Sequence, residues 1–178
     1  MIIVLTVSLG VLYPVAVWGI AQLAFPHQAN GSLVEQNGTV VGSELIGQGF
    51  TSAKYFQSRP SAAGSGYDAG ASGGSNLGPT NAKLISRIEA DVETLGGNAQ
   101  SNRVPADLLT TSASGLDPHI SPAAAEFQIS RVARARGIND SDLRRIVGEF
   151  TEARQIFLLG EPRVNVLRLN LALDKISK

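Results

Sequence analysis

The fold is decided first by residues 1–26, which read MIIVLTVSLGVLYPVAVWGIAQLAFP. This stretch contains no Asp, Glu, Lys or Arg, and the first charged side chain is Glu35. A helix from Ile2 to Phe25 would be roughly 36 Å long, which is enough to cross a hydrocarbon core of ~30 Å. A cleaved signal peptide has a shorter apolar region of ~7–15 residues, and a buried core helix is a third interpretation. We therefore predict a transmembrane anchor over residues 1–26.

Two features inside this stretch predict a partner in the membrane. Pro14 lies near the middle, where a proline kinks a helix and frees a backbone carbonyl that lipid cannot satisfy. Thr6 and Gly10 have the small-xxx-small spacing that lets a second helix approach closely. Pro14 and Gly10 are therefore candidate partner contacts. The alternative is that glycine and proline are simply commoner in spanning helices than in soluble ones.

Composition limits the rest of the chain to one soluble domain, residues 27–178. The 178 residues are 43% hydrophobic, which is enough for one sizeable core. Lys and Arg number 15 and Asp and Glu number 15, so no overall field favours nucleic acid as a partner. There is no Cys, and the two histidines are His27 and His119. We expect no metal site of the Cys or His-rich kinds.

The pattern of elements after the anchor predicts an α+β fold. Asn37-Gly38 between short apolar runs indicates a small β element within Ser32–Phe56. Apolar residues at helical spacing then predict four helices, at about 81–95, 121–136, 143–159 and 165–176. The expected fold is one N-terminal transmembrane helix followed by a single soluble domain with a small β element and about four helices.

Residues 61–80, SAAGSGYDAGASGGSNLGPT, are too rich in Gly, Ser and Ala to supply much core. They predict a surface loop, either ordered or mobile. Because the loop leads into a helix at Asn81, its backbone N–H groups could meet an anion. The loop lacks the Gly-Lys-Ser/Thr ending of a phosphate loop, so a contact loop is favoured, with Gly74, Ser75 and Asn76 as candidate partner contacts.

The segment Ser114–Ser121, SGLDPHIS, gathers a serine, an acid and a histidine. An anchored hydrolase using Asp117, His119 and a serine is one interpretation. Triad members normally converge from separate segments, however, and Asp117-Pro118 is typical of a turn that leads into a helix capped by Ser121. We therefore predict no catalytic residue.

Basic side chains offer two further candidate sites. The first is a cluster for which mutual pairing on a solvated surface is favoured over a phosphate or acidic-partner site; it contains Arg131, Arg134, Arg136, Arg144 and Arg145, with Glu126, Asp140 and Asp142 nearby. The second is Arg59 in Gln57-Ser58-Arg59-Pro60, which has no acid close in sequence. Arg59 is expected either to pair across the fold or to project to a partner.

Longer runs of residues together resemble one family. They are FPHQANGSL, GSELIGQGF, YFQSRPSA, ASGGSNLGPTN, VPADLLTTSASGLDPHISPAAA and GEPRVNVLRLNLALD, in that order along the chain. With the apolar anchor, these runs resemble the C subunit of the Kdp potassium-transporting P-type ATPase over nearly the whole chain.

The resemblance implies a single-pass subunit of a bacterial inner-membrane pump. Its partners would be a potassium-channel-like subunit, an ATP-hydrolysing subunit, a small accessory subunit and membrane lipid. The chain itself would be no enzyme but would be needed for assembly and activity. The resemblance also places the soluble domain on the outer, periplasmic side, which charge does not indicate because the first lysine is Lys54.

The family has also been described as a catalytic chaperone that raises the ATP affinity of the hydrolysing subunit. Gln57, Ser58, Arg59 and Pro60 match the segment proposed to contact nucleotide. A domain outside the cytoplasm could not reach ATP, so we favour partner docking for these residues. We expect no firmly bound cofactor, with ATP meeting this chain only through the complex. A membrane-anchored solute-binding module that uses the glycine-rich loop, or the hydrolase above, is the alternative.

Overall fold

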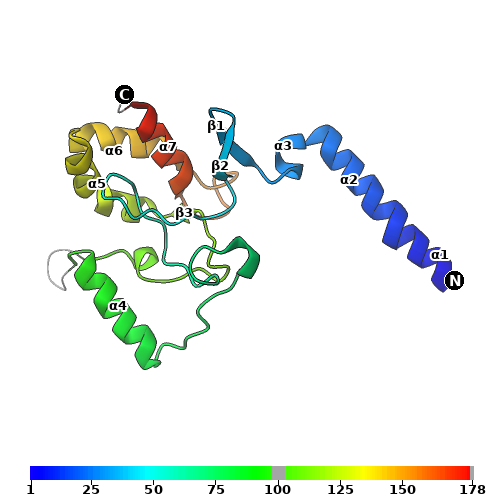
Figure 1. Cartoon of the computed structure of the whole chain (residues 1–178), viewed down its shortest axis with the longest axis horizontal. Coiled ribbons are helices and arrows are strands. Elements are labelled where there is room, and N and C mark those ends of the chain that lie inside the picture. The colour runs from blue at the N-terminus through cyan, green and yellow to red at the C-terminus, as the bar shows by residue number, and fades with distance from the viewer. Residues whose placement is uncertain (98–102, 177–178) are drawn as a thin grey trace. The chain divides into compact units, whose positions relative to one another are not determined.

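A computed structural model of the chain describes residues 1–97 and 103–176. The described chain divides into two compact units, Met1–Leu45 and Ile46–Lys178. The prediction of an α+β fold with one N-terminal apolar helix is confirmed (Figure 1). The predicted domain boundary after Pro26 concerns membrane topology and stays a prediction.

The first unit begins with a helix from Ile2 to Ala24, which is long and apolar enough to cross a membrane. Its 23 residues would span about 35 Å. The helix consists of α1 (Ile2–Val7), a π-helical turn (Ser8–Leu12) and α2 (Tyr13–Ala24). The π-helical turn contains Gly10 and ends just before Pro14, the second residue of α2. A wider turn of this kind is one way in which a spanning helix accommodates proline.

A short helix α3 (Pro26–Ala29) then leads into a β-hairpin. Strands β1 (Leu33–Gln36) and β2 (Thr39–Ser43) pair antiparallel. Asn37 and Gly38 form the turn with φ values of 54° and 77°, as a two-residue hairpin of matching twist requires. The predicted β element is therefore present, although its strands end at Ser43.

The second unit contains three helices that pack around one core: α5 (Pro122–Arg136), α6 (Asp140–Glu149) and α7 (Val166–Ile176) (Figure 1). A small antiparallel sheet joins them, with the order β3 (His119–Ile120), β5 (Arg163–Asn165), β4 (Thr151–Glu152). Helix α5 begins as predicted, because the Ser121 hydroxyl accepts a hydrogen bond from the Ala124 N–H at 3.0 Å and Pro122 occupies the first turn.

The prediction for the third helix was wrong at its C-terminal end. The apolar spacing that begins at Leu143 predicted a helix to about Leu159, but α6 ends at Glu149. Strand β4 follows, and residues 155–159 form the turn between β4 and β5. The apolar run at 156–159 continues the helical pattern without contributing to the core, which misled the periodicity argument.

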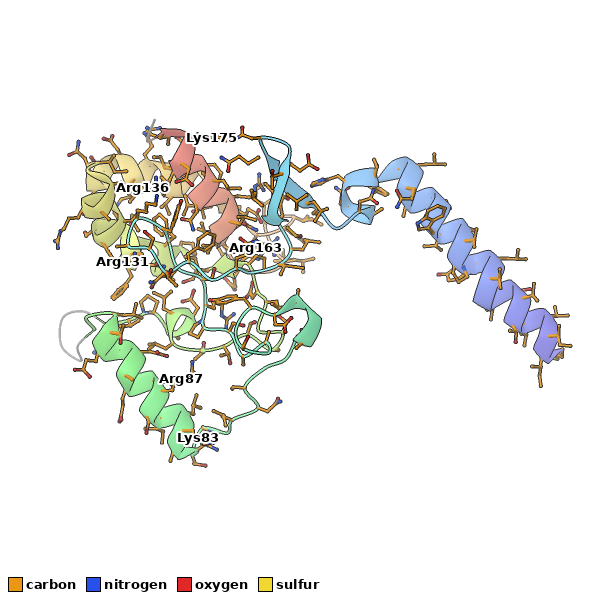
Figure 2. The ribbon with its side chains drawn as sticks, viewed as in Figure 1. Lys83, Arg87, Arg131, Arg136, Arg163 and Lys175 are labelled. Atoms are coloured by element: carbon orange, nitrogen blue, oxygen red, sulfur yellow. The ribbon has the colours of Figure 1, made fainter. Side chains whose placement is uncertain are left out.

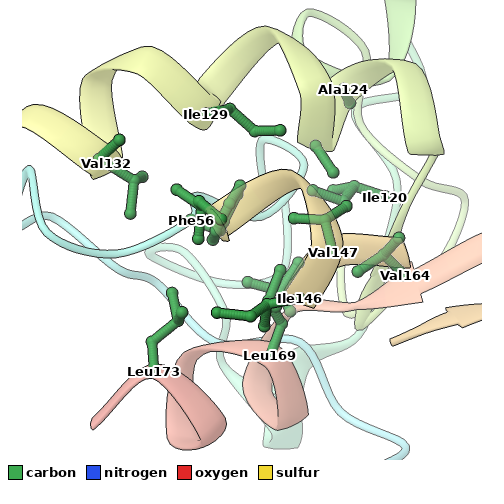
Figure 3. Packing of buried hydrophobic residues seen from close by; sticks show 14 of the residues in the cluster. Phe56, Ile120, Ala124, Ile129, Val132, Ile146, Val147, Val164, Leu169 and Leu173 are labelled. Atoms are coloured by element: carbon green, nitrogen blue, oxygen red, sulfur yellow. The ribbon is translucent and has the colours of Figure 1, made fainter. Parts of the chain in front are cut away.

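The core of this unit surrounds Phe56, which belongs to no helix or strand and is 0% exposed. Figure 3 shows its ring between Ile129 and Val132 of α5 and side chains from α6 and α7. Helix α4 (Ala82–Thr94) matches the predicted helix but has no fully buried residue. The Arg87 Nη2 of α4 donates to the Leu109 carbonyl at 2.9 Å, which ties this helix to the loop that precedes β3.

Candidate functional site

The candidate site is built on residues 53–60. This segment begins in a turn, continues without helix or strand from Phe56 onward, and has its backbone held by two buried side-chain amides. Asn170 of α7 accepts from the Phe56 N–H at 2.9 Å and donates to the Phe56 carbonyl at 2.9 Å. Gln128 of α5 accepts from the Gln57 N–H at 2.7 Å and donates to the Gln57 carbonyl at 3.2 Å. Both amide side chains belong to residues only 1% exposed. Each amide bonds both the N–H and the carbonyl of one residue, as a directly opposed residue in an antiparallel strand does.

Arg136 holds the start of the same segment. Its Nε donates to the Lys54 carbonyl at 2.6 Å, and its Nη2 bonds Asp174 of α7 at 2.9 Å. The guanidinium lies 5.2 Å from the centre of the Tyr55 ring, whose hydroxyl also donates to Asp174, at 2.9 Å. The Arg136 side chain is only 4% exposed, so this ion pair and cation–π contact are largely shielded from solvent.

Arg131 holds the same segment as Arg136. These two members of the predicted arginine cluster are therefore engaged within the fold and do not form part of a solvated surface. Arg131 donates to the Ala53 carbonyl at 2.8 Å and to the Gln128 side chain at 2.7 Å, and burial lowers its pKa. Both Arg131 and Arg136 project from α5 (Figure 2). The predicted surface pairing is confirmed for the two arginines of α6: Arg144 with Glu126, and Arg145 with Glu149.

Arg59 pairs across the fold, which is one of its two predicted alternatives. Its Nη1 lies 3.0 Å from Asp117 Oδ2, and two longer bonds of 3.4 Å reach the Thr110 and Thr111 carbonyls. The other Asp117 oxygen accepts from the His119 N–H at 3.0 Å and lies 3.4 Å from His119 Nδ1. Burial raises the pKa of Asp117, but the hydrogen bonds from His119 and Arg59 and the charge of Arg59 outweigh it and lower the pKa to about 2.

Both serines of the hydrolase-like segment are engaged elsewhere: the Ser114 hydroxyl accepts from the Leu116 N–H at 3.1 Å, and Ser121 belongs to the start of α5. The Ser121 hydroxyl caps α5 and donates to Asp107 at 3.1 Å, while the Ser121 N–H donates to the same carboxylate at 2.6 Å. His119 is bonded to Asp117 instead, and within residues 1–97 and 103–176 no serine hydroxyl is recorded as its partner. The predicted Ser121 cap is confirmed, but the predicted turn at Asp117-Pro118 is not: residues 116–118 lie outside any turn and lead into β3, and Asp117 fixes that stretch through the His119 N–H.

The four residues 57–60 line three cavities, of which one, of about 180 Å³, is lined by Gln57 together with Gln128 and Arg131. Gln57, Ser58 and Pro60 line one of about 290 Å³, together with Tyr67 and residues near the end of α4. Arg59 lines another of about 470 Å³, which also contains Asp117 and His119. Of these four residues the one cation, Arg59, therefore lines only the cavity that contains Asp117 and His119.

The glycine-rich loop is packed against the segment that contains Asp117. The Ser61 hydroxyl donates to the Gly115 carbonyl at 2.6 Å, and the Tyr67 hydroxyl donates to the Arg59 carbonyl at 2.6 Å. At Gly74 an added Cβ would lie 3.1 Å from the Ala113 carbonyl oxygen, so a side chain there would crowd the backbone. Of the other predicted contacts, Ser75 is half-buried and Asn76 is exposed with a φ of 52°.

Sequence reasoning missed the two amides that hold the site. Gln128 lies on the apolar stripe of α5 with Ala125, Ile129 and Val132, and Asn170 lies on that of α7 with Val166 and Leu173. A polar residue on an inward-facing stripe was the available signal, because a buried amide requires hydrogen-bond partners. The sequence could not say which backbone would supply them.

No group of three or more His, Cys, Asp or Glu residues that could hold a metal ion is found in residues 1–97 and 103–176. The polar residues around 53–60 are matched mainly to protein backbone and to each other. These polar groups therefore hold the segment in place and are already engaged within the protein, so they do not form a ready-made ion-binding site.

Comparison with known proteins places the whole chain in one family. A family model described as "K+-transporting ATPase, c chain", KdpC, matches residues 1–175. The potassium-transporting ATPase KdpC subunit of Rhodospirillum rubrum is 58% identical over 175 residues, covering 96% of this chain and 90% of that protein. The KdpC subunit of Koribacter versatilis is 56% identical over 174 residues (98% and 90%), and that of Myxococcus xanthus 57% over 176 residues (97% and 83%). The chain therefore belongs to the KdpC family and is a membrane-anchored subunit of a potassium-transporting ATPase.

Proposed function

We propose that this chain is a non-catalytic accessory subunit, needed for assembly and activity of the pump, with its soluble domain on the outer side of the bacterial inner membrane. The observation that carries the proposal is the engagement of the hydrolase-like side chains. Ser121 caps α5, and Asp117 is held by Arg59 and His119. A nucleophile needs a hydroxyl beside a general base. Here the serine, aspartate and histidine instead stabilise the start of α5 and the residues that lead into it.

Docking is the role that the surface around residues 57–60 supports. Because Asn170 and Gln128 fix the backbone at Phe56 and Gln57, little conformational entropy is lost when a partner binds there. Gly74, Ser75 and Asn76 extend the candidate contact surface. Within the anchor, Gly10 and Pro14 are candidate contacts for a neighbouring helix. The partners would be the potassium-channel-like, ATP-hydrolysing and small accessory subunits.

Direct nucleotide binding is the second candidate function, and the cavity of about 290 Å³ beside Gln57 and Ser58 is the observation in its favour. Its volume is near the lower limit of ligand pockets, roughly 300 Å³. Among its described lining residues there is an acid, Asp91, but no Lys or Arg. Since phosphates are normally held by cations and backbone donors, this lining favours an apolar side chain of a partner over ATP.

Substitution of Arg59 separates docking from nucleotide contact. In pump purified with all subunits, Arg59→Ala should reduce copurification and potassium uptake, while the ATP concentration for half-maximal hydrolysis barely changes. Asp117→Asn is the matched control, because it breaks the same ion pair and keeps the guanidinium. If Arg59 only stabilises the domain, the two variants should lose complex equally. If Arg59 also contacts a partner, Arg59→Ala should lose more.

The same preparations locate the domain. In sealed vesicles of known orientation, protease should cleave residues 46–178 only from the outer side. Two results together would contradict the docking proposal and support direct nucleotide contact. One is a large rise in the ATP concentration that Arg59→Ala needs for half-maximal hydrolysis while assembly stays intact; the other is cleavage of the domain from the cytoplasmic side.

Removal of residues 1–26 tests the anchor. The second compact unit keeps all its core residues, so the truncated chain should be soluble and folded. It should copurify poorly with the pump, because both membrane retention and packing through Gly10 and Pro14 are lost. Full potassium uptake by the truncated chain would show that the helix has no packing role.

A further inference from the structure

The turn between β4 and β5 carries four consecutive large apolar side chains in solvent. Ile156, Phe157, Leu158 and Leu159 are 82%, 94%, 78% and 57% exposed. We call this segment the apolar tip. Contiguous exposed apolar residues on a soluble domain usually mark a site of contact with another protein or with a membrane.

The conformation of the apolar tip shows that turn formation does not explain its residues. Ile156 and Phe157 have φ values of 52° and 60°, a region that β-branched and bulky residues rarely adopt. Hairpin turns with positive φ normally use Asn and Gly, as Asn37 and Gly38 do in the first unit. The side chains at the apolar tip therefore require a role outside the turn itself.

Part of the backbone of the apolar tip is hydrogen-bonded within the turn itself. The Leu158 and Leu159 N–H groups donate to the Gln155 carbonyl at 3.1 and 2.9 Å, and the Gln155 N–H donates to the Leu159 carbonyl at 2.8 Å. Backbone groups that enter hydrocarbon need such internal partners, because lipid supplies none.

Charged residues lie immediately behind the apolar tip and are paired. Arg154 and Glu161 are 2.6 Å apart, and Arg163 and Glu152 are 2.9 Å apart. An apolar end followed by Arg and Glu is the arrangement expected of a segment that enters the acyl boundary and leaves its charges among the headgroups.

We propose that the apolar tip inserts into the interface of the same bilayer that holds the N-terminal helix. The anchor helix tethers the second unit near a bilayer, so the bilayer is an apolar phase that the apolar tip can reach. Only residues 25–45 separate the end of that helix from the second unit. They fold into α3 and the β1–β2 hairpin, and even fully extended they could span no more than roughly 70 Å. Tethering at this distance gives a high local concentration of lipid, so even weak insertion is populated. The inference does not depend on which face of the membrane the domain occupies.

Fluorescence of the full-length chain tests the proposal. Trp18, the one tryptophan, is replaced by Phe, and Phe157→Trp then reports on the apolar tip. The chain is reconstituted in vesicles of phosphatidylethanolamine and phosphatidylglycerol with brominated acyl chains. Insertion by roughly 5–10 Å should shift the emission to the blue and quench most of it. Emission typical of exposed tryptophan, without quenching, would overturn the proposal.

Two further variants make the result specific. Ile85→Trp, at a 45% exposed position of α4, is the control and should stay unquenched; equal quenching there would mean that the domain lies on lipid without using the apolar tip. Leu158→Glu in the Phe157→Trp chain should abolish most of the quenching. If the blue shift arises only after the other pump subunits are added, and without quenching by lipid, the apolar tip contacts a protein and the bilayer proposal is wrong.

Discussion

Phe56 and Phe157 occupy opposite environments in the second compact unit: Phe56 is 0% exposed and Phe157 is 94% exposed. The backbone at Phe56 is bonded by Asn170, a residue of a distant helix, whereas the turn at Phe157 bonds only within residues 154–159. Both residues lie outside helices and strands, and they differ in what bonds the nearby backbone. Phe56, whose backbone is bonded by a distant helix, is held in the core, whereas Phe157, in a turn that bonds within itself, faces outward and is available to another phase.

The largest expected effect is at the buried side of this comparison. Phe56→Ala should lower the free energy of unfolding by about 3–5 kcal/mol, because it removes a ring from the centre of the core and leaves a cavity. Urea unfolding of the full chain in detergent, followed by near-ultraviolet circular dichroism, measures this loss. Phe157→Ala is the matched control and should change stability by no more than about 0.5 kcal/mol. Similar losses in the free energy of unfolding for Phe56→Ala and Phe157→Ala would show that the two rings do not differ in burial as described.

The second prediction concerns the amide clamp, by which we mean the hydrogen bonds from the Asn170 and Gln128 side chains to the backbone of Phe56 and Gln57. Asn170→Leu should cost about 2–4 kcal/mol, because both the N–H and the carbonyl of Phe56 lose their partners inside the core. Lys175→Leu, an exposed change in the same helix, should cost less than about 0.5 kcal/mol. The same unfolding assay applies. A neutral Asn170→Leu would mean that water or a shifted backbone satisfies Phe56 without the amide.

The third prediction is a pH dependence. The folded pKa of Asp117 is lowered from 3.8 to about 2, so its carboxylate stabilises the folded state above pH ~4, and this contribution is lost as pH falls through about 2. Because the carboxylate is partly exposed and screened by solvent, the stabilisation is about 1 kcal/mol. Asp117→Asn should lack this contribution. Stability measured from pH 6 down to pH 2 should therefore differ most between the two proteins at pH 6 and converge at low pH. A constant difference at every pH would contradict the lowered pKa.

The smallest expected effect is at the apolar tip. The double substitution Ile156→Asn and Phe157→Gly places residues that prefer positive φ at both positions and should raise the free energy of unfolding by about 1 kcal/mol. Unfolding in detergent measures this change without a bilayer. A loss of more than about 1 kcal/mol would show that the apolar tip packs against its own domain, which would end the contrast with Phe56.

Features encoded within a few residues were predictable from the sequence. Asn37-Gly38 specifies its hairpin locally, because both residues tolerate positive φ. Ser121 and Pro122 specify the start of α5, and Gly137, with a φ of 69°, specifies its end. The apolar length from Ile2 to Ala24 needs no tertiary information either.

Features that depend on distant partners were not. Strands β3, β4 and β5 have only two or three residues each and are defined by pairing with one another. The end of α6 was missed because Ile156–Leu159 prolong its apolar pattern while facing solvent. For Arg59 the sequence left two alternatives open, since Asp117 is 58 positions away. Whether Gln57–Pro60 dock a partner stays a prediction.

The clamp on residues 55–57 also sets the order in which the domain can fold. Its hydrogen bonds join residues separated in sequence by 71, 114 and 119 positions, to Gln128, Asn170 and Asp174. Contacts of such separation close late, after local helices and hairpins have formed. During synthesis the anchor helix leaves the ribosome before α7. We therefore expect residues 55–57 to stay without their partners Asn170 and Asp174 until α7 is made, so a truncation before Asn170 would leave an anchored protein with an open core.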